Sequence, residues 1–227
     1  MSRNTIVVKT EACEEYRYLL AHGYAEKAAL KLVGDRHRLP KLERNCLFRG
    51  TVVPETAATR LRKIVAPEAV RGRPLGVDWY NVQITVETYL AGGVLFLADD
   101  GITRDAAAVH GSWRRSARTA PATEALLAAI ARLEPGRIDV YLDAPVAFSG
   151  DLAGELREAI RAAIPGAASE VALAASADGP LKRYEGIVAS SDSVVLDAAA
   201  EAIDLPRLAL DWRYGFSPPP LDGPRSP

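Results

Sequence analysis

Aspartate side chains close five short apolar runs of this 227-residue chain. Short continuous apolar runs of this kind are typical of the buried strands of a parallel sheet. Because the carboxyl ends of parallel strands meet at one edge, where open α/β folds bind their ligands, we expect these carboxylates to gather there. The aspartates are Asp78, the pair Asp99 and Asp100, Asp143, Asp178 and Asp192.

Several carboxylates at one edge repel one another unless a cation neutralises them, and hard oxygen ligands favour Mg²⁺ or Mn²⁺. Such a cation would activate a water and stabilise charge on a phosphodiester. The alternative is structural, because aspartate is also a preferred helix N-cap and turn residue, which would account for Asp178 and Asp192 without a ligand. The metal ligands predicted by the doubled and repeated pattern are Asp78, Asp99, Asp100, Asp143 and Asp192.

Other site chemistries are less well represented. The three histidines, His22, His37 and His110, lack the spacing of a zinc motif, and Ser149 is not in a nucleophile elbow. The chain has no GxGxxG or phosphate-loop glycine pattern. Its two cysteines form no disulfide framework, which fits a reducing cytoplasm.

The formal net charge of −1 hides an asymmetry. Residues 1–74 hold 15 Lys and Arg against 8 Asp and Glu, a net charge of +7, and the remainder carries −8. A basic part beside an acidic site could attract the phosphates of RNA. The alternatives are that the basic helices dock on the acidic part or are simply solvated, and that Arg104 pairs with Asp100 or Asp105. The candidate substrate-binding residues are Arg36, Arg38, Lys41, Arg44, Arg49, Arg104 and Arg114.

Helical periodicity dominates residues 1–74, which are predicted to form a small all-helical unit, including two helices within residues 11–33 joined at Gly23. Residues 75–216 alternate apolar strands with helices at 123–133, 152–164 and after Asp192. This alternation predicts an α/β domain with a mostly parallel sheet covered on both faces.

Two further segments need an interpretation. Residues 82–91 alternate like a strand before a Gly92-Gly93 turn, but a right-handed crossover requires a helix there, which we favour. The proline-rich residues 217–227 are predicted to be a disordered tail.

No window approaches the roughly 18 apolar residues of a membrane span. The first apolar stretch is too short for a signal peptide because charges return at Lys9 and Glu11. We therefore expect a soluble cytoplasmic protein without a membrane partner.

The segment Gly76 to Val82, GVDWYNV, resembles the opening of NYN domains, which are relatives of PIN-type ribonucleases. Four positions match the family in order: Asp78 and Asn81 within this segment, Asp143 in VYLDAP, and Asp192 in ASSDS. The resemblance spans about residues 75–210 and implies a NYN/PIN-like fold and a metal-dependent ribonuclease. Asp78, Asp143 and Asp192 would then hold the metal, and Asn81 would orient a ligand or the attacking water.

Over its whole length the chain resembles an uncharacterised prokaryotic family, the domain of unknown function 434 proteins, with their companion C-terminal domain. The residues that carry this resemblance include Gly23-Tyr24, Arg49-Gly50, Asp99 to Gly101 and Asp143 to Pro145. This second resemblance implies an architecture but no activity.

The leading hypothesis is a Mg²⁺- or Mn²⁺-dependent ribonuclease whose catalytic residues are Asp78, Asn81, Asp143 and Asp192. A non-catalytic RNA-binding or adaptor protein with a nuclease-like fold is the second hypothesis. It is favoured by Trp79, where the NYN pattern has glycine, and by the few His and Lys residues near the site. A phosphatase acting on a small molecule is a third, weaker hypothesis.

Overall fold

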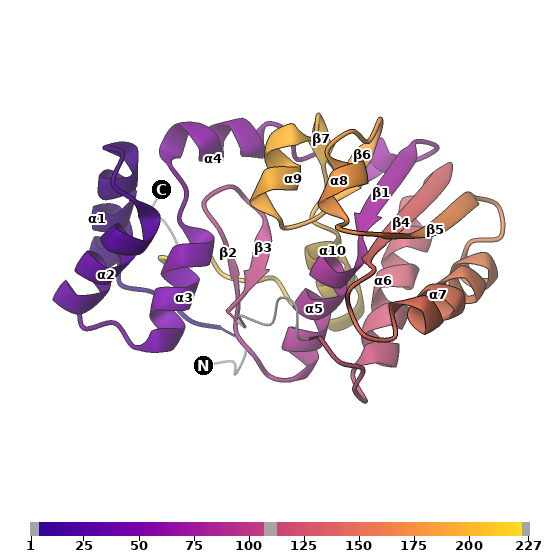
Figure 1. Cartoon of the computed structure of the whole chain (residues 1–227), viewed down its shortest axis with the longest axis horizontal. Helices are drawn as coiled ribbons and strands as arrows, with labels where there is room; N and C mark the ends of the chain where they lie inside the picture. Colours follow the sequence, from indigo (N-terminus) through magenta and orange to yellow (C-terminus); the bar gives the residue numbers. More distant parts are fainter. Residues whose placement is uncertain (1–4, 107–112, 224–227) are drawn as a thin grey trace.

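The computed structural model describes residues 5–106 and 113–223. Helices from the first third of the chain lie at one end of the molecule, and a parallel sheet with its helices lies at the other (Figure 1). None of the helices in the described ranges has the length and apolar character needed to cross a membrane.

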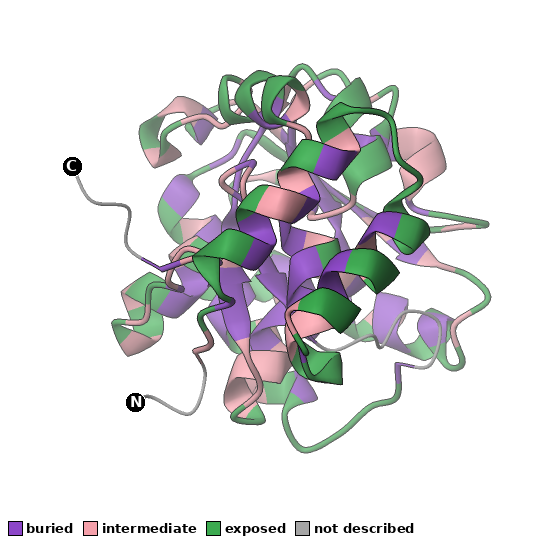
Figure 2. Ribbon diagram, turned by 90° about the vertical axis from the view of Figure 1, so that its left-hand side faces the viewer, coloured by how far each residue is buried: buried purple, intermediate pink, exposed green. Residues whose placement is uncertain are grey.

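The N-terminal helical unit consists of α1 (Thr10–Ala21), α2 (Glu26–Arg36), α3 (Lys41–Gly50) and α4 (Pro54–Leu61), followed by the short η1 (Pro67–Val70). As expected, two helices flank Gly23, which takes a φ of 78° that favours glycine. Their inner faces bury Tyr16, Val33 and Leu47, and their outer faces are exposed (Figure 2).

Five strands form a parallel sheet in the order β5-β4-β1-β6-β7. The strands are β1 (Pro74–Asp78), β4 (Arg137–Asp143), β5 (Ala168–Ala174), β6 (Ile187–Ala189) and β7 (Glu201–Ala202). The chain is therefore a mixed α/β protein with a mostly parallel sheet, as the sequence predicts. Because β4 and β6 flank β1 on opposite sides, the strand order reverses between β1 and β6. In open α/β sheets, ligands bind in the crevice beyond the strand ends at such a point.

Helices cover the parallel sheet on both faces (Figure 1). On one face lie α5 (Trp79–Leu90), α6 (Thr119–Leu133), α7 (Ser149–Ala163) and α10 (Leu205–Tyr214). On the other lie α8 (Asp178–Leu181) and α9 (Ser193–Ala198). Helix α5 confirms the helical interpretation of residues 82–91. Helix α9 ends at Ala198, earlier than the periodicity suggests, because the chain turns into β7.

The second apolar run does not join the parallel sheet. Strand β2 (Leu95–Leu97) pairs antiparallel with β3 (Thr103–Asp105), and Gly101, with a φ of 78°, lies in the turn between them. Phe96 and Ala98 are buried against the N-terminal helical unit. Asp99 and Asp100 therefore lie in a hairpin turn, and the expectation that they mark an end of a parallel strand is wrong.

Residues 217–223 are ordered, contrary to the disorder that their proline content suggests. Leu221 is buried in the core of the helical unit, where its amide donates to the Leu97 carbonyl and its carbonyl accepts from the Val8 amide. An extended segment can pair along a strand edge even where proline removes some donors, which explains why this composition packs. The last four residues of the predicted tail lie outside the described residues.

Candidate functional site

Asp78 is the centre of a hydrogen-bonded cluster at the point where the strand order reverses. Its side chain is buried at the end of β1, and its Oδ2 accepts hydrogen bonds from Asn81 Nδ2 and, at 2.8 Å, from Ser190 Oγ. Ser191 Oγ donates to Asn81 Oδ1 at 3.2 Å. The cluster thus joins the first turn of α5 to the loop after β6, and each side chain in it is positioned by a strand end or a helix start.

A second carboxylate lies close enough to influence Asp78. Asp143 ends the neighbouring strand β4, two residues beyond Tyr141, the partner of Asp78 in the β-ladder. Burial raises the pKa of Asp78 to about 7, the hydrogen bonds from Ser190 and Asn81 oppose this rise, and the negative charge of Asp143 adds to it. Asp143 Oδ1 accepts the Ala177 amide at 2.8 Å. The ends of these two strands therefore bring two carboxylates close enough to repel each other.

Tyr80 adds a buried polar atom beside this pair. Its hydroxyl is buried without a hydrogen-bond partner in the described structure. Burial, with the charge of Asp143, raises the pKa of Tyr80 to about 12. A buried hydroxyl that lacks a partner is uncommon and marks a position where a water or ligand could be accommodated.

Asp192 is a helix N-cap, which is the structural alternative to a metal ligand considered for it. Its Oδ1 accepts the amides of Val194 and Val195, at 2.7 and 3.2 Å, and so caps α9. Its own amide donates to Ser190 Oγ at 3.1 Å, which links the cap to the Asp78 cluster. In the described ranges, no group of three or more His, Cys, Asp or Glu residues is arranged to hold a metal ion. The carboxylates that remain together are Asp78 and Asp143.

Arginine side chains, rather than a cation, neutralise the hairpin aspartates. Asp99 accepts two hydrogen bonds from Arg17, of 2.8 and 2.6 Å. Asp100 is fully buried and accepts hydrogen bonds from Arg104 at 2.7 and 2.8 Å and from Arg60 at 3.0 Å. Asp99 and Asp100 are therefore poor candidates for metal ligands. The strand that precedes them, β2, belongs to the two-stranded sheet, and their carboxylate oxygens form ion pairs with arginines. Arg104 pairs with Asp100, one of the two partners considered for it.

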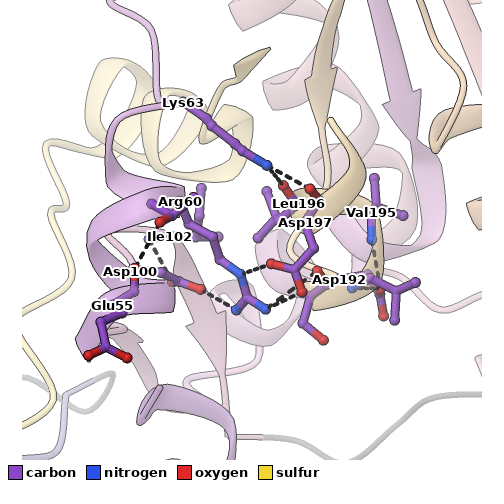
Figure 3. Close-up of polar contacts among 12 residues, drawn as sticks. Glu55, Arg60, Lys63, Asp100, Ile102, Asp192, Val195, Leu196 and Asp197 are labelled. Atoms are coloured by element: carbon purple, nitrogen blue, oxygen red, sulfur yellow. Dashed lines mark hydrogen bonds and ion pairs between the residues drawn. The ribbon is translucent and has the colours of Figure 1, made fainter. Parts of the chain in front are cut away.

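Arg60 connects the helical unit to the sheet domain. Figure 3 shows its guanidinium between Asp100 and Asp197 of α9, while Lys63 reaches the carbonyls of Leu196 and Asp197 at the end of the same helix. A cation at a helix C-terminus satisfies carbonyls that lack intrahelical partners. These contacts fix α4 across α9 and so set the distance between the basic helices and the Asp78 cluster.

A cavity of about 760 Å³ separates the two parts of the chain at this junction. Asn81, Ser191 and Asp192 line it from the sheet domain, and Arg49 and Thr51 line it from the helical unit. Arg60 and Arg104 contribute to its wall. The volume lies within the range of ligand sites, roughly 300 to 1,000 Å³. The basic and acidic parts of the sequence therefore face a common cavity as well as each other.

The other predicted substrate-binding residues are dispersed. Arg36 pairs with Glu15, Arg44 with Asp35 and Arg49 with Asp105. Among the described residues, Arg38, Lys41 and Arg114 form no ion pair, and Arg114 lines a different cavity. Only Arg49 and Arg104 of the predicted set reach the cavity beside Asn81.

Sequence reasoning missed three residues of this region. Ser190 and Ser191 hold Asp78 and Asn81, and the Ser-Ser-Asp triplet after an apolar run was the available signal. Arg60 gave no local signal, because its importance arises from Asp100 and Asp197, which are distant in sequence.

Comparisons with known proteins place both parts of the chain among proteins of unknown function. Residues 67–208 match the family described as domain of unknown function DUF5616, and residues 10–63 match the family described as protein of unknown function DUF434. An uncharacterized protein of Methanocaldococcus jannaschii is 32% identical over 204 residues, which cover 86% of this chain and 96% of that relative. No solved structure matches the chain.

Proposed function

Because this chain belongs to the DUF5616 family, whose description names no activity, we propose its function from the site: a Mg²⁺- or Mn²⁺-dependent phosphodiesterase acting on RNA. The observation that carries the proposal is the pair of Asp78 and Asp143 at the ends of the neighbouring strands β1 and β4, with Asp78 also at the point where the strand order reverses. The order of Asp78, Asn81, Asp143 and Asp192 along the chain resembles that of the NYN and PIN-type nucleases, which supports the same reaction.

The carboxylate pair fits a hard divalent cation. Asp78 accepts two side-chain hydrogen bonds on Oδ2, and Asp143 accepts the Ala177 amide on Oδ1. Mg²⁺ is usually bound through one or two carboxylates together with water and substrate phosphate, so a third protein carboxylate is not required. When bound, the cation would supply a water of lowered pKa and charge neutralisation at the phosphate. Asp192 acts in this proposal through the loop that carries Ser190.

Asn81 and the cavity supply the substrate side of the proposal. Asn81 donates to Asp78 and accepts from Ser191, which fixes the plane of its amide at the cavity wall. Arg49 and Arg104 line the same cavity, where a guanidinium suits phosphate, although Arg49 also pairs with Asp105 and Arg104 with Asp100. RNA is proposed as the substrate because the helical unit carries a net charge of +7 in residues 1–74.

The decisive experiment compares metal-dependent cleavage by Asp78→Asn, Asp143→Asn and the double variant. We expect each single variant to lower Mn²⁺-dependent cleavage of single-stranded RNA by at least about 100-fold, the order of loss for an essential electrostatic group. Asp211→Asn, which alters an exposed aspartate of α10, is the matched control and should cleave normally. Circular dichroism and thermal unfolding establish that the variants fold. Unchanged cleavage in the double variant would overturn the proposal.

The capping role of Asp192 favours a second candidate function, a non-catalytic RNA-binding or adaptor protein, because it leaves two carboxylates for a metal. Calorimetric titration with Mn²⁺ separates the two functions. Binding that is lost in Asp143→Asn supports the hydrolase, whereas no binding to the wild-type protein at millimolar Mn²⁺ supports the adaptor. Comparing mononucleotides with oligonucleotides as substrates tests the phosphatase alternative.

A further inference from the structure

A second cavity, of about 720 Å³, lies on the loop that follows Asp143. Pro145, Ala147 and Phe148 of this β4–α7 loop line it on one side, and Trp113 and Arg114 line it on the other. None of these residues takes part in the Asp78 cluster. The loop begins directly after Asp143, the last residue of β4, although neither Asp78 nor Asp143 lines the cavity itself.

Phe148 is the most unusual residue of this cavity. Its relative exposure is 80%, and its backbone adopts a left-handed conformation with φ 62° and ψ 22°. That conformation is uncommon for a residue other than glycine, asparagine or aspartate. Because the phenyl ring is exposed, it also contributes no hydrophobic stabilisation to the fold. Residues held in such conformations cluster at ligand sites, where the surrounding structure maintains them.

The loop that carries Phe148 is held by its own hydrogen bonds. Ser149 Oγ donates to the Ala144 carbonyl at 3.1 Å, and the Ser149 amide donates to the Val146 carbonyl at 3.1 Å. The Phe148 carbonyl accepts the Leu152 amide, which starts α7. These hydrogen bonds hold the backbone that carries the Phe148 ring beside the cavity.

The opposite wall combines a fixed aromatic residue with a cation. Trp113 is buried, donates its Nε1 hydrogen to Glu87 at 3.0 Å, and contacts Tyr80, with 5.2 Å between ring centroids. Arg114 is exposed and forms no ion pair with any residue in the described ranges, whereas Arg115 pairs with Glu155. The cavity thus offers an exposed aromatic ring, an apolar wall and the guanidinium of Arg114, and the exposed carboxylate of Asp151 also lines it.

We propose that this cavity is a subsite for single-stranded RNA, in which a nucleobase stacks on Phe148 and a neighbouring phosphate contacts Arg114. The choice of RNA as the ligand rests on the proposed function. Stacking on an exposed ring with a cation nearby is how proteins hold single-stranded nucleic acid without reading its sequence. The subsite would hold the nucleotide flanking the one at the Asp78 and Asp143 pair, so that the substrate strand runs along the carboxyl edge of the sheet.

The test measures binding separately from cleavage. Fluorescence anisotropy of a labelled oligouridylate is recorded in EDTA for the wild-type protein and in the Asp78→Asn background. We expect Phe148→Ala to raise the Kd about tenfold, within the range for loss of one base–aromatic stack. Phe148→Tyr should bind normally, because it keeps the ring and the backbone conformation. Tyr18→Ala, which removes another exposed aromatic side chain, on α1, is the matched control.

Abasic substitution identifies the stacking partner. Replacing one nucleotide of the oligouridylate by an abasic spacer at successive positions should weaken wild-type binding at one position but have no further effect there in Phe148→Ala. Arg114→Gln should reduce the slope of log Kd against log salt by about 0.7, the value for one phosphate contact on a single strand.

The outcomes distinguish this inference from the proposed function. RNA binding that depends on Phe148 without any Mn²⁺-dependent cleavage upholds the subsite and overturns the hydrolase. Cleavage with unchanged binding and turnover in Phe148→Ala upholds the hydrolase and overturns the subsite. Absence of RNA binding by the wild-type protein, or equal abasic effects in both proteins, also overturns the subsite.

Discussion

At the scale of a residue, Ser190 shows how this site depends on side chains that position Asp78 and have no proposed catalytic or metal-binding role. Its hydroxyl donates to Asp78 Oδ2 and accepts the amide of Asp192, so one side chain ties the β1 end to the start of α9. A hydroxyl can fill both roles at once because it carries a donor and two acceptor lone pairs.

Ser190→Ala is expected to lower the affinity for Mn²⁺ by about tenfold, because outer residues that orient a ligating carboxylate typically contribute this much. Calorimetric titration measures the affinity directly and does not depend on turnover. Ser169→Ala, at an exposed position of β5, is the control and should bind Mn²⁺ as the wild-type protein does. Equal affinity in both variants would show that Ser190 does not position Asp78 for a metal.

Asp99 and Asp100 show the limit of assigning chemistry to a residue from its place in a pattern. Both follow an apolar run, as Asp78 and Asp143 do, yet both accept hydrogen bonds from arginines. The difference arises from the partner strand, because β2 pairs with β3 and not with β1. The role of a carboxylate depends on the charges that the fold brings to it.

At the scale of elements, α4 and α9 form the contact that positions the cavity. Arg60 of α4 donates to both oxygens of Asp197, at 2.7 and 2.9 Å. The hydrogen bonds and charge of Arg60 lower the pKa of Asp197, although partial burial acts in the opposite direction. Helix α9 is also the helix that Asp192 caps, so the same six-residue element supports the site and the docking of the helical unit.

Asp197→Asn should reduce the free energy of unfolding by about 1 kcal/mol at pH 7, since half of the Asp197 side chain is exposed and solvent screens the pair. A carboxyl with a lowered pKa stabilises the fold above its unfolded-state pKa, near 3.8, and loses that contribution as the pH falls through the folded-state value. Urea unfolding of both proteins should therefore show a constant difference above about pH 5 that shrinks below pH 4.

Glu185→Gln is a suitable comparison for Asp197→Asn, because Glu185 is an exposed acid of the α8–β6 loop that forms no ion pair with a described residue. Its stability should follow that of the wild-type protein across this pH range. A difference for Asp197→Asn that persists unchanged to pH 2 would contradict the ion-pair explanation.

At the scale of the whole molecule, the β2–β3 hairpin lies within the sequence of the α/β part but packs against both the helical unit and the α/β part. Phe96 and Ala98 pack into the core of the helical unit, and Ile102 packs with Leu196 of α9. Asp100, between Arg60 and Arg104, lies at the centre of this shared region. Burial acts to raise the pKa of Asp100, but the two arginines hold it below its usual value.

Asp100→Asn should lower the free energy of unfolding by about 3 to 5 kcal/mol, because it leaves two buried guanidinium groups without their shared carboxylate. The loss should appear in one cooperative urea transition monitored by tryptophan fluorescence and by circular dichroism, since the affected contacts join both parts. Asp211→Asn should change the stability by less than about 0.5 kcal/mol. A loss below about 1 kcal/mol for Asp100→Asn would contradict this account.

Local patterns in the sequence determined the helical first third, four of the five strand-terminal aspartate positions beside the parallel sheet, and the helix over residues 82–91. These features depend on periodicity and on the right-handed crossover, which are properties of neighbouring residues. The pairing of β2 with β3, the packing of residues 217–223 and the joining of Arg60 to Asp100 and Asp197 were decided by the tertiary structure. Each of these contacts joins segments that are distant in sequence, and the local sequence of one segment does not indicate which other segment it contacts. The sequence alone identified the candidate carboxylates. Only the tertiary structure distinguished Asp78 and Asp143 from the others, because the strand order makes their two strands neighbours and arginines neutralise Asp99 and Asp100.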